Sequence, residues 1–92
     1  MPYIESSRRK VIETDLASLL SLIRSSGDQF TKGDLNYTVT RLVMTWLVTN
    51  GQSYSHMSDV TGILSDIQAE FRRRVMDPYE DLKKDKYGEV FY

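Results

Sequence analysis

The chain has 92 residues, of which 40% are hydrophobic and 27% are charged, and its formal net charge is −1. This length and composition are typical of one small folded unit, so we expect residues 1–92 to form a single domain. A net charge near zero argues against nucleic acid as a partner, because such binding relies on a broad basic surface. The chain has no cysteine, which excludes disulfides, thiolate metal sites and a cysteine nucleophile.

Hydropathy gives no indication of a membrane segment. The longest apolar-rich run, residues 42–48, is interrupted by Thr45 and is far shorter than a transmembrane helix. The first residues also lack the apolar stretch of a signal peptide. We therefore expect a soluble, intracellular protein with no membrane partner.

Residues 6–23 are expected to form an amphipathic helix, because apolar residues recur there at spacings of three and four. Ser6 or Ser7 is a suitable N-cap, and the run of small and polar residues at 25–28 ends the helix. The residues expected to face the core are Ile12, Leu16, Leu19, Leu20 and Ile23.

Residues 35–49 carry conflicting signals. Many of them are β-branched threonines and valines, which favour a strand. The apolar residues, however, follow a helical period after Asp34, which is a good N-cap, and the run is long for a strand. We expect a helix ended by Asn50-Gly51, with a strand as the alternative. The apolar face consists of Leu35, Val39, Leu42, Val43, Trp46 and Leu47.

A loop over residues 52–57 and a third helix capped by Ser58 are expected next. The third helix carries an apolar stripe of Val60, Ile63, Leu64, Ile67, Phe71 and Val75. Asp77-Pro78 interrupts this pattern, because proline lacks an N–H group. Asp77 as N-cap, Pro78 at N1 and Glu80 at N3 would then start a short helix ending near residue 84, unless the third helix resumes after a kink.

The expected fold class is therefore all-α: a small bundle of three main helices plus a short C-terminal helix. The chain has more apolar surface than so small a core can cover, so we expect an oligomer in which the excess is buried between subunits. The residues concerned are Met44, Trp46, Val48 and the terminal aromatic residues. The β-propensity of residues 2–4 and 87–92 leaves open a short β-ribbon between the two ends.

Patterns for catalysis are weak. His56 is the only histidine, and serines adjacent to it in sequence rarely reach the geometry of a catalytic triad. The carboxylates Asp77, Glu80, Asp81 and Asp85 resemble a Mg²⁺ site, but helix capping explains two of them without a metal. We expect no enzymatic activity, no metal and no cofactor. The least favoured alternative is a metal-dependent enzyme of nucleotide metabolism that relies on Glu80 and Asp81.

Two polar-rich stretches, residues 33–41 and 70–81, are the candidate binding surface. Arginine binds phosphate through paired N–H groups, and tyrosine offers a ring on which a base stacks, so the expected ligand is a nucleotide-type anion. The same composition is typical of protein–protein hot spots, and Asn36 and Tyr37 could instead only stabilise the fold. The candidate ligand-binding residues are Asn36, Tyr37, Thr40, Arg41, Arg73, Tyr79 and Glu80.

These stretches also carry a family resemblance. The relevant segments are Met1-Pro2-Tyr3-Ile4 with Arg8-Arg9, residues 33–37 with Thr40-Arg41, and residues 70–75 with 78–81 and 88–90. Together they resemble a family of small proteins of unknown function, found in bacteriophages and bacterial genomes, whose pattern is roughly MPYI, GELNY.IT, EFYRRV..PYED and GDVY. Asp34, Val39 and Arg72 depart from that pattern, as do residues 86–88.

The resemblance implies a viral origin and supplies no activity. Small phage proteins commonly act on the host by binding, which is an argument by association. We therefore expect a non-catalytic phage protein of the host cytoplasm that forms a homo-oligomer. Its expected role is to counter host defence by sequestering a nucleotide-type signal. The alternative is inhibition of a host enzyme or defence complex by binding to that protein.

Overall fold

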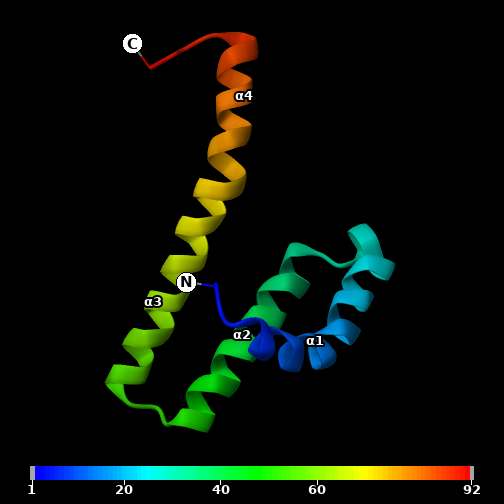
Figure 1. Cartoon of the computed structure of the whole chain (residues 1–92), viewed down its shortest axis with the longest axis vertical. Helices are drawn as coiled ribbons and strands as arrows, with labels where there is room; N and C mark the ends of the chain where they lie inside the picture. Colours follow the sequence, from blue (N-terminus) through cyan, green and yellow to red (C-terminus); the bar gives the residue numbers. More distant parts are fainter. Residues whose placement is uncertain (1, 92) are drawn as a thin grey trace. The chain divides into compact units, whose positions relative to one another are not determined.

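A computed structural model describes residues 2–91, and that part of the chain contains helices and no strand (Figure 1). The all-α prediction is therefore confirmed, including three main helices and a shorter last one. Two short segments, the 3-10 helix η1 and the π-helix η2, join them. The elements are α1 (Ser6–Ser26), η1 (Gly27–Gln29), α2 (Lys32–Asn50), α3 (Tyr54–Phe71), η2 (Arg72–Met76) and α4 (Asp77–Tyr87).

Contacts between Cα atoms divide the chain into two compact units. The first unit, Tyr3–Met57, contains α1, η1, α2 and the first turn of α3. The second unit is built on Ser58–Tyr92 and contains the rest of α3, η2 and α4. None of the helices in residues 2–91 combines the length and apolar character needed to cross a membrane.

Helix α1 starts without a side-chain cap. Its N-cap residue is Glu5, so the prediction that Ser6 or Ser7 caps the helix is wrong, because both serines already lie inside it. The backbone carbonyl of Glu5 accepts hydrogen bonds from the N–H groups of Arg8 and Arg9, at 3.0 and 3.1 Å. These bonds close the first turn in place of a side chain.

Helix α2 starts with a capping box. The Thr31 hydroxyl accepts a hydrogen bond from the Asp34 N–H at 3.2 Å, and the Asp34 carboxylate accepts one from the Thr31 N–H at 2.9 Å. Asp34 is thus the third residue of the helix and not the predicted N-cap. The reciprocal pair satisfies two N–H groups that the first turn leaves unpaired, which fixes the start of α2 at Lys32.

The threonine-rich middle of α2 is helical, as predicted from its period. The hydroxyls of Thr38, Thr40 and Thr45 each donate to the carbonyl oxygen four residues earlier, at 2.8, 2.8 and 2.7 Å. Each polar group is thus satisfied within the helix, which offsets the preference of threonine for strands.

The turn between α2 and α3 is shorter than predicted. Helix α3 begins at Tyr54, not at Ser58, because the Ser53 hydroxyl accepts a hydrogen bond from the His56 N–H at 3.1 Å and acts as the cap. The His56 Nδ1 lies 2.8 Å from the Gly51 carbonyl oxygen, and the His56 ring meets Trp46 edge-on at 5.6 Å. His56 therefore joins the end of α2 to the start of α3.

Helix α3 passes through η2 into α4 without a break. The Asp77 N–H donates to the carbonyl oxygen of Arg72, five residues earlier, which is the bond of a π-helix. Pro78 has no N–H for the carbonyl of Arg74, and its ring would crowd that carbonyl in a regular α-helix, so a wider turn precedes it. The predicted capping by Asp77 is wrong, because the N-cap residue is Met76, which is itself helical and makes no side-chain cap bond.

The predicted helix faces are only partly covered. Among residues 2–91 one hydrophobic side chain, Leu47, is buried, with 8% of it exposed. No Cα atom of α1 lies within 8 Å of one in α2, so these two fully described helices do not pack as closely as a bundle requires. The half-covered apolar residues of the first unit are Leu16, Leu19, Leu20, Ile23, Phe30 and Val43.

The short β-ribbon between the two ends does not form among residues 2–91. Gly88, at φ 93°, ends α4, and the Glu89 carboxylate accepts hydrogen bonds from the N–H groups of Val90 and Phe91 at 3.0 and 2.9 Å. In a two-stranded ribbon one of these two N–H groups would donate to the partner strand, so this local turn competes with the ribbon.

Candidate functional site

The N-terminal half of α2 carries a polar face. Lys32, Gly33, Asn36, Tyr37 and Thr40 line an open pocket of about 560 Å³. Their spacing of roughly four residues places them on successive turns of one side of the helix. Tyr37 has 65% of its surface exposed, so its ring and hydroxyl are available to a ligand. Three of the predicted ligand residues, Asn36, Tyr37 and Thr40, are thus brought together.

A hydrogen bond within this face orients Asn36. The Thr40 hydroxyl donates to the Asn36 backbone oxygen at 2.8 Å and lies 3.4 Å from its amide oxygen. The amide NH₂ of Asn36 is a donor on an exposed residue, and Asn36 lines the same pocket as Lys32. Arg41, the fourth predicted residue on α2, does not line this pocket.

Arg73, on η2 in the second unit, is held in an ion pair. Its Nη2 lies 3.0 and 3.2 Å from the two carboxylate oxygens of Glu70. The Glu70 carboxylate offsets the charge of Arg73, which weakens the case for Arg73 as a phosphate contact.

Tyr79 and Glu80 lie one and a half turns further along, at the start of α4. The Lys83 ammonium is 5.4 Å from the centre of the Tyr79 ring and 5.5 Å from that of Tyr87, and the Lys86 ammonium is 5.2 Å from Tyr87. Cations at these distances are attracted to the face of the ring. The Tyr79 ring predicted to stack on a base is therefore already covered on one side by Lys83.

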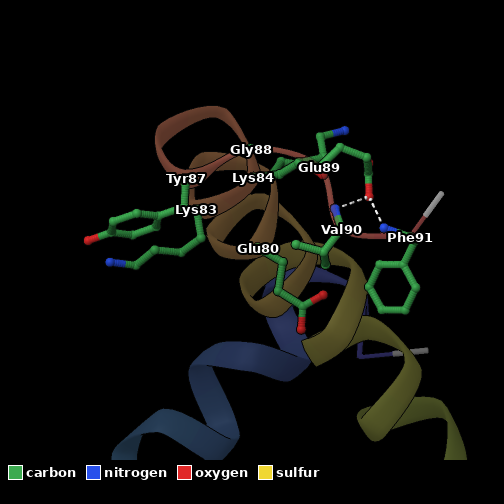
Figure 2. Close-up of a pocket in the computed structure, with 9 residues that line it drawn as sticks. Glu80, Lys83, Lys84, Tyr87, Gly88, Glu89, Val90 and Phe91 are labelled. Carbon is green, nitrogen blue, oxygen red and sulfur yellow. Dashed lines mark hydrogen bonds between the residues drawn. The ribbon is translucent and has the colours of Figure 1, made fainter.

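Glu80 lines a second open pocket, of about 500 Å³, between α4 and the C-terminal residues. Figure 2 shows Lys83 and Tyr87 extending to one side of α4, with Val90 and Phe91 on the other. Lys84 and Glu89 also line the pocket. Its charged groups are of both signs, so it has no clear preference for an anion or a cation.

The acidic residues of α4 do not form a metal site. Within residues 2–91 no group of three or more histidines and carboxylates is arranged to hold a metal ion. Asp77, Asp81 and Asp85 follow one another at spacings of four on one side of the helix, with Glu80 beside them, so helical spacing alone does not assemble a metal site.

Sequence reasoning missed the two lysines that accompany these sites, Lys32 beside Asn36 and Lys83 between two tyrosines. Helical spacing is the signal that would have found them. Lys32 precedes Asn36 by four residues, and Lys83 lies four residues from both Tyr79 and Tyr87.

A comparison with known protein families identifies the family of this chain. Residues 1–90 match a domain of unknown function, DUF6899, so the chain belongs to that family. No curated protein and no solved structure matches the chain. Because the function of this family is unknown, membership in it assigns no activity to the chain.

Proposed function

We propose that the chain is a non-catalytic bacteriophage protein that acts on the host by binding, as a homo-oligomer in the host cytoplasm. The phage assignment rests on the resemblance carried by residues 1–4, 33–41 and 70–81. The observation that carries the binding role is the polar face of α2, where an ammonium group, an amide, an exposed tyrosine and a hydroxyl line one pocket.

The favoured partner is a host protein, an enzyme or a defence complex, which the phage protein inhibits. Small-molecule sites are usually concave and enclose most of the ligand, whereas this face lies along a single helix and is open. Protein interfaces accept open surfaces, and their binding energy is concentrated in exposed aromatic residues such as Tyr37.

A nucleotide-type ligand is the second candidate, and sequestering such a signal would also counter host defence. The specific observation in its favour is that Lys32, Asn36 and Tyr37 share one pocket. They supply a cation for phosphate, an amide for the edge of a base and a ring for stacking.

The test compares two exposed tyrosines. Full-length protein captures host proteins from lysate as wild type, as Tyr37→Ala and as the control Tyr54→Ala, whose residue is 87% exposed and lies outside the polar face. We expect Tyr37→Ala alone to lose the specific partner, with a loss of at least about 2 kcal/mol if Tyr37 is a hot spot.

Equal capture by wild type and Tyr37→Ala would contradict the α2 face as the binding surface. A parallel thermal-shift series with mono-, di- and cyclic nucleotides separates the two candidates. A rise in Tm with one nucleotide class, lost in Tyr37→Ala, favours the nucleotide ligand over the host protein.

A further inference from the structure

The apolar stripe of α3 lies in the second unit and remains uncovered. Its residues from Ile63 onward are between 40% and 54% exposed, although they have the helical spacing of a buried face. We propose that this stripe is where two copies of the chain pair, with their α3 helices antiparallel and a twofold axis near Ile67 and Gln68. This inference rests on the proposed oligomer and adds the surface and the polarity of its interface. The stripe residues are Val60, Ile63, Leu64, Ile67, Phe71 and Val75.

The spacing of the stripe suits a twofold axis. A symmetric dimer needs a surface that is complementary to itself, so each residue must meet a suitable residue of the second copy. Val60 and Val75 lie at equal distances along the sequence from the midpoint between Ile67 and Gln68, and so do Leu64 and Phe71. In an antiparallel pair Val60 therefore meets Val75 of the second copy and Leu64 meets Phe71. Ile67 lies at the axis, opposite Gln68 and next to Ile67 of the second copy, while Ile63 lies opposite Arg72.

Charge selects the antiparallel direction. Asp59 comes directly before Val60, and Arg74 comes directly before Val75. Antiparallel pairing brings Asp59 close to Arg74 of the second copy at both ends of the stripe. Parallel pairing would instead place residues 72–74, three arginines, against the same three arginines, and like charges at such positions are unfavourable.

The exposed area is sufficient for a stable dimer. The chain exposes 8134 Å². A folded monomer of 10.7 kDa is expected to expose about 5,500 Å². The difference is about 2,600 Å² per chain, so the chain leaves more surface uncovered than a monomer of its mass, and a second copy on the α3 stripe would cover part of that surface.

The first test is the oligomeric state of the full-length protein by sedimentation, for wild type, Ile67→Glu and Ser65→Glu. Ile67→Glu places two carboxylates at the twofold axis, and we expect the dissociation constant of the dimer to rise at least about a hundredfold. Ser65 lies two residues away, on the opposite side of the helix, so the same added charge should leave the dimer intact. Both residues are exposed in the single chain, and circular dichroism checks that the helices are retained.

The second test determines directly whether the two α3 helices are antiparallel or parallel, and it does not depend on a destabilising variant. The chain has no cysteine, so Gln68→Cys and Thr61→Cys each introduce a single thiol. The two positions are seven residues apart and share one flank of the stripe. In the antiparallel pair the two thiols at position 68 are neighbours, whereas the two thiols at position 61 are about 20 Å apart. A short bifunctional maleimide should therefore crosslink Gln68→Cys and not Thr61→Cys.

Three results would overturn the proposal. They are a monomer at all accessible concentrations, a dimer that persists in Ile67→Glu, and equal crosslinking of the two cysteine variants, which indicates parallel helices. These results do not depend on whether the polar face of α2 binds a host protein, because sedimentation uses no host component. Tyr37→Ala should still form dimers, so loss of capture by this variant reports on the α2 face and not on the loss of the dimer, and equal capture by a dimeric Tyr37→Ala would contradict the α2 face alone.

Discussion

Replacing Gly62 by alanine should stabilise the protein. Gly62 is in the interior of α3, where glycine costs about 1 kcal/mol relative to alanine. A Cβ atom added there meets no other atom within 4 Å. Gly62 also lies about 160° around the helix from Val60 and about 140° from Ile67, so it is on the side away from most of the apolar stripe. The substitution therefore gains helix propensity without loss of any packing.

The expected gain in the free energy of unfolding, about 1 kcal/mol, corresponds to a rise in Tm of about 5 °C for a chain of this length. Thermal unfolding followed by circular dichroism at fixed protein concentration measures it, since self-association makes Tm depend on concentration. The matched control is Gly51→Ala, which should lower Tm because Gly51 has a φ of +103°. A lower Tm for Gly62→Ala would refute the reasoning and would show that another helix approaches α3 closely at Gly62.

Two further substitutions test local contacts. Thr31→Ala removes the hydroxyl of the capping box with Asp34 and should lower the free energy of unfolding, measured in urea, by about 1 kcal/mol. Thr31→Ser retains a hydroxyl and should keep most of that stability. An equal loss in both variants would rule out the hydroxyl as the cause. His56→Ala removes the contact with Gly51 and the edge of the Trp46 ring. Its fluorescence spectrum should change, because the chain has one tryptophan, and an unchanged spectrum would contradict the ring contact.

Helix type could be predicted from the sequence more reliably than helix ends. The period of residues 35–47 gave the correct prediction against the β-branched composition, because threonine hydroxyls bond within the helix. The predicted helix starts were wrong where two suitable N-cap residues lie close together in the sequence. Thr31 and Asp34 are both good N-caps three residues apart, and only the reciprocal pair reveals which one starts α2. Ser53 and Ser58 present the same ambiguity for α3.

In the candidate site, helical spacing predicted which residues lie on the same face of a helix. It did not predict which of several neighbouring side chains forms a given ion pair. Asn36 and Thr40 are four residues apart, and their neighbourhood on α2 follows from the helix alone. The pairing of Arg73 with Glu70 depends on which arginine of three adopts the right rotamer. The exposure of the α3 stripe was not predictable either, because a periodic apolar face looks the same whether it packs within a chain or between chains.

The π-helical turn at residues 72–76 has a consequence for how the length of this protein can vary. A π turn holds more residues than an α turn, so α3 and α4 keep the rotational phase of a continuous α-helix that is one residue shorter. Loss of one of the three consecutive arginines would remove the extra residue and leave every face of α4 aligned with α3, although Pro78 would then crowd the carbonyl oxygen four residues before it. The loss of one residue at this point therefore keeps the faces of α3 and α4 in register, whereas the loss of one residue elsewhere in the helix rotates them apart by about 100°.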